Sequence, residues 1–95
     1  MALEINFYSL LKLELNTSQI QIELDKKMTI KQLIEKLDKQ YDNIFSEKLL
    51  TDSRSKIDRG TIILINGHNV LHLDGLNTEV KDGDVISIFP PSGGG

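Results

Sequence analysis

The run Pro-Pro-Ser-Gly-Gly-Gly at the C-terminal end has the composition best suited to chemistry. Pro90 and Pro91 favour an extended polyproline geometry, whereas Gly93, Gly94 and Gly95 lack a Cβ and can adopt nearly any backbone conformation. Such a tail can enter a narrow channel and present its terminal carboxylate inside another protein. After activation, for example by adenylation, that carboxylate can react with a sulfur nucleophile, which displaces AMP. A frayed terminus or a Ser/Gly linker is the alternative interpretation of the same residues.

The other residues offer little for catalysis or metal binding. The sequence holds no cysteine, which excludes disulfides, thiolate metal sites and a cysteine nucleophile. His68 and His72 are four residues apart, but we expect them in a turn and a strand, with no further ligand to complete a metal site. Asp82 and Asp84 lack the additional ligands of a calcium loop. We therefore expect no metal site and no independent enzymatic activity.

The composition indicates one small domain that binds neither nucleic acid nor membrane. Ninety-five residues suffice for one domain with a modest core. The net charge of −3 and the aromatic content of 5% offer nucleic acid few cationic or stacking partners. No stretch approaches the roughly 20 apolar residues that span a bilayer, and no signal peptide is visible. The expected compartment is therefore the cytoplasm.

Alternating apolar residues predict an antiparallel hairpin at the start of the chain. If residues 3–14 are extended, one face carries Ile5, Phe7, Ser9, Leu11 and Leu13. In the next segment, Ile20, Ile22 and Leu24 alternate with polar residues, which is the period of a strand. Residues 16–18, Asn-Thr-Ser, supply the turn between the two predicted strands.

One amphipathic helix is predicted after this hairpin. Thr29 and Gln32 have the spacing of a capping box, which predicts that the helix begins at Thr29. The apolar residues of the helix recur at the spacing of a single helical face: Ile30, Leu33, Ile34, Leu37 and Tyr41. The pattern predicts about three turns of helix that cover one face of a sheet.

The second half of the chain is expected to add short strands. Residues 42–60 predict an irregular connection with a helical turn near residues 46–50. The predicted strands are residues 61–65, 70–73 and 85–89, and the predicted turns are Asn66-Gly67, Asp74-Gly75 and Asp82-Gly83-Asp84. The order of elements predicts an α+β domain over residues 1–91, with one main helix on one face of a mixed sheet. Residues 92–95 are expected to form a flexible glycine tail.

The last predicted strand has two different faces. Ile86 and Ile88 suit the side that faces the helix, because both are large and apolar. Phe89 then points to the open side of the sheet, next to the tail. An exposed aromatic ring at that position would make a good anchor for a partner protein. The alternative is that Phe89 simply folds back on the sheet.

The C-terminal third of the chain resembles the MoaD/ThiS group of sulfur carriers, in particular the small subunit of molybdopterin synthase. The resemblance rests on Asn66-Gly67, on Asp82-Gly83-Asp84, and on the ending Phe89-Pro90-Pro91 followed by two variable residues and Gly94-Gly95. Ser92 and Gly93 occupy the two variable positions, although a bulkier residue than Gly93 is more usual there. The resemblance implies the ubiquitin-like β-grasp fold over the whole chain.

The resemblance also implies a mechanism in which this protein is a substrate. An E1-like activating enzyme (MoeB-like) would use ATP to adenylate the Gly95 carboxylate, and a sulfur donor protein would convert this transient acyl-adenylate to a thiocarboxylate. The tail would then enter the large subunit of molybdopterin synthase (MoaE-like), with Phe89, Pro90 and Pro91 at the partner interface. No permanently bound cofactor is implied. The absence of cysteine agrees with this chemistry, because the carrier itself needs no thiol.

Two other functions share the same activated carboxylate. One is sulfur donation to the thiazole of thiamine, although thiazole carriers are usually shorter across the region of residues 42–60. The other is protein modification, in which Gly95 is joined to lysines of other proteins. The Phe-Pro-Pro ending favours the pterin pathway, and the sequence leaves the modifier role open.

Overall fold

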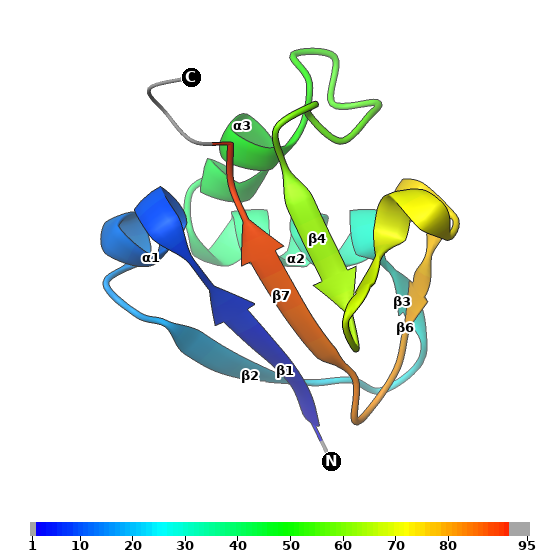
Figure 1. Cartoon of the computed structure of the whole chain (residues 1–95). Helices are drawn as coiled ribbons and strands as arrows, with labels where there is room; N and C mark the ends of the chain where they lie inside the picture. The colour runs from blue at the N-terminus through cyan, green and yellow to red at the C-terminus, as the bar shows by residue number, and fades with distance from the viewer. Residues whose placement is uncertain (1, 92–95) are drawn as a thin grey trace.

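A mixed five-stranded sheet with helices on one side forms the body of the computed structural model, which describes residues 2–91 (Figure 1). The strands stand in the order β2 (Gln19–Glu23), β1 (Ala2–Phe7), β7 (Val85–Phe89), β4 (Ile62–Ile65) and β5 (His68–Asn69). Among the strands of residues 2–91 in this sheet, only the neighbours β1 and β7 pair in parallel. A separate two-stranded sheet pairs β3 (Met28–Thr29) with β6 (Glu79–Val80). The mixed sheet predicted from the sequence is confirmed.

The helix α2 (Ile30–Gln40) covers the sheet as its apolar period predicts. The capping box is present. The backbone amide of Gln32 donates to the Thr29 hydroxyl oxygen at 3.1 Å, and the backbone amide of Thr29 donates to the Gln32 side-chain oxygen at 2.9 Å. These two bonds satisfy amide groups that an uncapped first turn leaves unpaired. The predicted helix face is buried, and Tyr41 stands at the C-cap.

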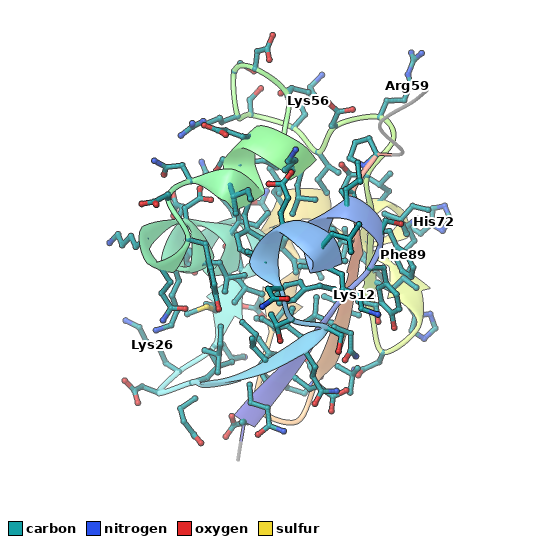
Figure 2. The ribbon with its side chains drawn as sticks, turned by 90° about the vertical axis from the view of Figure 1, so that its left-hand side faces the viewer. Lys12, Lys26, Lys56, Arg59, His72 and Phe89 are labelled. Atoms are coloured by element: carbon teal, nitrogen blue, oxygen red, sulfur yellow. The ribbon has the colours of Figure 1, made fainter. Side chains whose placement is uncertain are left out.

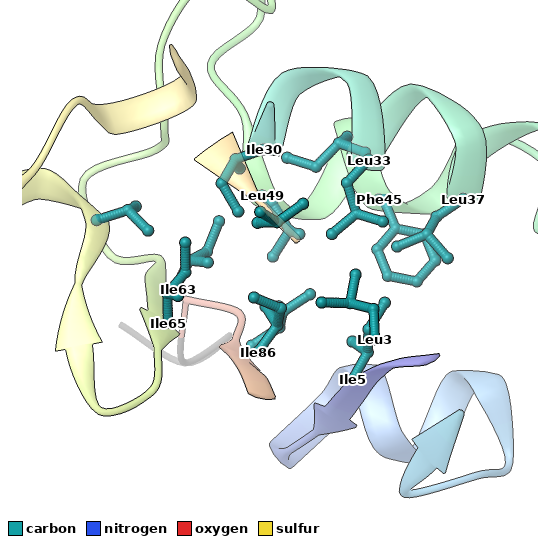
Figure 3. Packing of buried hydrophobic residues seen from close by; sticks show 14 of the residues in the cluster. Leu3, Ile5, Ile30, Leu33, Leu37, Phe45, Leu49, Ile63, Ile65 and Ile86 are labelled. Carbon is teal, nitrogen blue, oxygen red and sulfur yellow. The ribbon is translucent and has the colours of Figure 1, made fainter. Parts of the chain in front are cut away.

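The core lies between the helices and one face of the sheet (Figure 3). The sheet contributes Leu3 and Ile5 from β1, Ile86 and Ile88 from β7, and Ile63 and Ile65 from β4. The helices contribute Ile30, Leu33, Ile34 and Leu37 from α2, and Phe45 and Leu49 from α3 (Ile44–Leu49). Every strand in this set alternates between buried and more exposed residues, which is the pattern of a sheet covered on one face.

The predicted first strand is too long, because residues 9–15 are helical. β1 ends at Phe7, and Ser9–Leu15 forms the helix α1. An α-helix brings residues four apart onto the same side, so that Leu11 is fully buried and Leu15 packs against the core while Leu13 is 73% exposed. Asn16, part of the predicted turn, ends α1 in a left-handed conformation, which asparagine tolerates better than most residues.

The helix α3 contacts both α1, through an ion pair, and β1, through a pair of aromatic rings. The Lys48 ammonium lies 2.7 Å from the Glu14 carboxylate, and the rings of Phe7 and Phe45 pack at 5.6 Å between centroids. The helical turn predicted near residues 46–50 is therefore confirmed, although α3 begins two residues earlier. Phe45 and Leu49 are fully buried, which explains why the helix forms in so polar a segment.

The predicted strand at residues 70–73 is wrong. After the tight turn at Asn66-Gly67, where both residues have positive φ, the chain makes only the short strand β5. It then enters two short 3₁₀ helices, η1 (Val70–His72) and η2 (Gly75–Asn77). The Asn69 side-chain oxygen accepts from the Leu71 amide at 2.9 Å, a local bond that competes with strand pairing.

The predicted domain boundary and flexible tail fall at residues 92–95, which lie outside the described residues, so both stay predictions. Within residues 2–91, no helix has the length and apolar character that crossing a membrane requires.

Candidate functional site

The last strand leads directly to the residues that the sequence singles out. β7 pairs in parallel with β1 and in antiparallel with β4, so its direction is fixed on both sides. Ile86 and Ile88 are buried and Phe89 is partly exposed, as predicted for the two faces of this strand. The strand ends at Phe89, where the two prolines begin, because proline has no amide hydrogen to continue the pairing.

The two prolines differ in exposure. Pro90 is buried, whereas Pro91 is partly exposed. Of this pair, Pro91 therefore offers more surface to a partner, and an interface role for either proline stays a prediction. The other predicted site residues, Gly93, Gly94 and Gly95, lie outside the described residues. Pro91 is the last residue before them whose position is described.

Phe89 lies in a small apolar patch on the open side of the sheet, here called the Phe89 patch and made of Tyr8, Ile62 and Phe89. The rings of Tyr8 and Phe89 are stacked, with centroids 4.2 Å apart and an angle of 8° between planes. Ile62 is the partner of Phe89 across the β4–β7 pair and is 43% exposed, while Tyr8 is 38% exposed. Phe89 thus packs on its neighbours and still keeps part of its ring at the surface.

Figure 2 shows Phe89 and His72 on the side of the molecule away from α2 and α3. No local sequence pattern points to Tyr8 or Ile62, because their proximity to Phe89 depends on strand register. In an antiparallel pair, residues directly opposite each other have side chains on the same face. Knowledge of the Ile62–Phe89 pairing is therefore enough to find Ile62. Tyr8 becomes a neighbour of Phe89 because β1 lies beside β7.

The two histidines do not form a metal centre with other side chains. His68 lies in β5 and His72 in η1. Among residues 2–91, no group of three or more His, Cys, Asp or Glu side chains lies close enough to hold a metal ion. The absence of a metal site stays a prediction.

The buried carboxylate of Asp38 has a structural explanation. Asp38 on α2 accepts a hydrogen bond from the Ser46 amide at 3.0 Å and a second from the Ser46 hydroxyl on α3. Both carboxylate oxygens are therefore occupied within the protein. Asp38 and Ser46, which are hydrogen-bonded to each other, line the neighbouring hollow of about 420 Å³ between α2, α3 and Arg54. Asp38 serves to join two helices, and a catalytic role is not needed to explain its burial.

Comparison with known proteins agrees with this architecture. The family model described as "ThiS family" matches residues 12–95. Small archaeal modifier protein 3 of Haloferax volcanii is 33% identical over 95 residues, which is 100% of each chain. A candidate sulfur carrier protein of Archaeoglobus fulgidus is 36% identical over 85 residues, covering 88% of this chain and 94% of the relative.

A solved structure supports the fold independently. The structure of a candidate molybdopterin converting factor subunit 1 from Pyrococcus furiosus superposes with a TM-score of 0.73. The match covers 97% of this chain and 99% of the other, at 24% identity. At that identity the likeness shows the fold alone.

The fold and these matches define a ubiquitin-like β-grasp protein of the sulfur carrier and protein modifier class. Members of this class are small non-catalytic proteins. The chain belongs to the ThiS family, which confirms the MoaD/ThiS resemblance derived from its C-terminal residues.

Proposed function

We propose that this protein carries sulfur as a thiocarboxylate on Gly95. The carboxylate oxygen of Gly95 attacks the α-phosphorus of ATP on an E1-like activating enzyme, and pyrophosphate leaves. A sulfur nucleophile from a donor protein then attacks the acyl carbon, and AMP leaves with the original carboxylate oxygen. With hydrosulfide as this nucleophile, the product is directly a terminal thiocarboxylate, in which one oxygen has been replaced by sulfur. With a donor persulfide, the acyl disulfide that forms first is cleaved by a second thiol, which releases the thiocarboxylate and ends as a disulfide with the donor.

The observation that carries this proposal is the position of Pro91. β7 is paired with β1 up to Ile88 and with β4 up to Phe89, and Pro90, the next residue, is buried. Pro91 therefore leaves the domain beside the Phe89 patch, four residues before Gly95. A partner that binds the patch is then placed next to the origin of the tail. The absence of cysteine supports the same chemistry, since no thiol of this chain can hold the sulfur.

For the destination of the sulfur, we propose molybdopterin synthesis, with the large synthase subunit as acceptor. The support is the ending Phe89-Pro90-Pro91 with Gly94-Gly95 in register, which resembles the small subunit of that synthase. Donation to the thiazole of thiamine is the weaker alternative, because the long connection around α3 is present here.

A second function, protein modification, is favoured by a specific observation. The relative that matches 100% of this chain is named a small archaeal modifier protein. In that role a lysine amine of a target protein, and not a sulfur nucleophile, attacks the same Gly95 adenylate and displaces AMP. Both roles therefore share the first step and differ only in the nucleophile.

The experiment that tests the proposal measures both outcomes in one reaction. The protein is incubated with ATP, its activating enzyme and a sulfide source, with and without cellular protein as lysine acceptor. We expect ATP–pyrophosphate exchange that depends on Gly95, followed by thiocarboxylate formation. Exchange followed only by isopeptide-linked conjugates, with no thiocarboxylate, would favour the modifier role. No exchange with the wild-type protein would overturn both.

Phe89→Ala tests whether the Phe89 patch is the docking surface. Burial of a phenylalanine side chain contributes roughly 1.5–3 kcal/mol, so we expect the dissociation constant for the large synthase subunit to rise by about 10- to 100-fold. The fold should lose only the Tyr8 stacking, about 0.5–1.5 kcal/mol, because Ile86 and Ile88 fill the core side. Titration calorimetry and thermal melts of the same variant measure the two effects.

Leu13→Ala is the control for Phe89→Ala, because it removes another exposed apolar side chain, from α1. We expect Leu13→Ala to change neither the dissociation constant for the large synthase subunit nor the melting temperature strongly. A large drop in melting temperature for Phe89→Ala with unchanged partner affinity would show that the ring serves the fold and not the interface.

A further inference from the structure

Gly60 lies against the backbone and ring of Pro91, at the point where the tail begins. A Cβ built on Gly60 would lie 2.9 Å from Pro91 Cβ and 3.3 Å from Pro91 Cα. Carbon atoms attract best at about 3.5–4.0 Å, so a side chain at position 60 would force Pro91 or the turn to move. Only glycine allows this close approach.

The backbone of Gly60 gives no other reason for a glycine. Gly67 and Gly75 have φ values of 87° and 57°, in the left-handed region, whereas Gly60 is not among the residues of positive φ. An alanine at position 60 therefore meets no backbone penalty of that kind. The contact with Pro91 is what excludes a side chain here.

The turn that carries Gly60 is firmly attached to α3. The carbonyl oxygen of Leu49 accepts from the Asp58 amide at 2.8 Å and from the Thr61 hydroxyl at 3.1 Å. The Thr61 amide closes the turn by donating to the Asp58 carbonyl at 3.0 Å, and Thr61 is only 2% exposed. Residues 58–61 thus form a turn that hydrogen bonds to α3 hold in place, and Pro91 packs against this turn.

The end of β7, which leads into the tail, is also held in place. Phe89 pairs with Ile62, the residue that follows this turn by one position, and its ring stacks on Tyr8. A side chain at position 60 is therefore expected to displace Pro91 rather than the turn or the strand. The displacement would change the direction in which the chain leaves the domain while the Phe89 patch stays in place.

We propose that Gly60 is a positioning residue for the C-terminal tail. Because Gly60 has no side chain, Pro91 can pack closely against the turn of residues 58–61. This packing sets the direction in which the chain leaves the domain, toward the active site of the partner that binds the Phe89 patch. This inference rests on the proposed activation of Gly95. Gly60 then affects how the Gly95 carboxylate reaches the active site of the partner, and does not affect binding of the partner to the Phe89 patch.

The first test is steady-state adenylation of Gly60→Ala by the activating enzyme. Misplacement of a reacting group by about 1 Å can cost 10²-fold in rate, but the glycines between Pro91 and Gly95 can absorb part of a displacement at Pro91. We therefore expect kcat to fall by about 10-fold. KM should change less than about twofold, because the Phe89 patch is retained. A variant with unchanged kcat, or one in which only KM rises, would overturn the inference.

Gly67→Ala is the matched control, since its added Cβ meets open space but a left-handed φ. We expect this variant to lower the melting temperature by about 4–8 °C without changing kcat. If Gly67→Ala lowers kcat as much as Gly60→Ala does, the effect reflects stability and the inference is wrong.

A double-mutant cycle with Pro91→Gly tests the contact itself. Pro91→Gly removes the ring that a Cβ on residue 60 would meet, so Gly60→Ala should lower kcat much less in this background than in the wild type. Equal effects in both backgrounds would contradict a role through Pro91.

A spectroscopic measurement separates this inference from the proposed function. In the free protein we expect a nuclear Overhauser contact between Gly60 Hα and Pro91 Hβ, and its loss in Gly60→Ala with other core contacts unchanged. Absence of the contact in the wild type would overturn the inference. Failure of the wild type to be adenylated would instead overturn the proposed function.

Discussion

Deletion of Gly94 and Gly95 will abolish sulfur transfer and leave the melting temperature nearly unchanged. Within residues 2–91, the buried apolar residues of the core lie between Leu3 and Ile88, and the pairing of β7 ends at Phe89. We therefore expect the deletion to remove the proposed reacting group and no core contact. Thiocarboxylate formation should become undetectable, whereas the thermal melt should shift by less than about 2 °C.

Ser92→Ala is the control for this deletion, because it changes the tail but keeps the diglycine. We expect it to support near wild-type transfer. If the deletion unfolds the domain, the tail is part of the folded core and the separation of fold from function is wrong. If the deletion retains full transfer, the sulfur is carried elsewhere.

Leu37→Ala will destabilise the fold by about 2–5 kcal/mol, as truncation of a fully buried leucine does. Leu37 is 0% exposed, on the face of α2 that packs against the sheet. The loss is a large part of the stability expected for a small domain. Chemical denaturation measures it as a fall in the midpoint at unchanged slope.

Lys36→Ala provides the comparison for Leu37→Ala, because Lys36 is its exposed neighbour on the same helix. We expect a change within about 0.5 kcal/mol for this surface substitution. A loss below about 1 kcal/mol for Leu37→Ala would mean that α2 contributes less to the core than its burial indicates.

The parts of the fold that the sequence predicted well are those with strong local patterns. α2 has both a capping box and a helical period, so its start and its buried face were found. β7 alternates cleanly, which placed Ile86 and Ile88 in the core and Phe89 on the other face. The Asn66-Gly67 turn was found because asparagine and glycine tolerate positive φ.

The errors occurred where two periods fit the same residues. In residues 9–15, Leu11 and Leu13 alternate as in a strand, but Leu11 and Leu15 also have helical spacing. Leu11 is fully buried and Leu15 packs against the core, which favours the helix. That core is built from residues distant in the sequence, so the local pattern alone does not decide between the two periods. At residues 70–73, the Asn69 cap favours a 3₁₀ turn over a strand, although Val and Leu suit both.

The candidate site could be predicted only where it follows the chain. Phe89 and the tail were recognisable because they are contiguous in sequence. Tyr8 and Ile62 were missed because they reach Phe89 through strand pairing and ring stacking. Gly60 was missed for a similar reason, since its contact with Pro91 joins residues 31 positions apart. The burial of Pro90 likewise depends on the tertiary fold.

Intact-mass spectrometry after activation tests the central claim most directly. The protein is treated with ATP, the activating enzyme and a sulfur donor, and its mass is compared with that of an untreated sample. Exchange of one oxygen for sulfur predicts a gain of about 16 Da, and fragmentation should place the whole gain on Gly95. A gain that persists after deletion of Gly95 and maps to an internal residue would contradict the account.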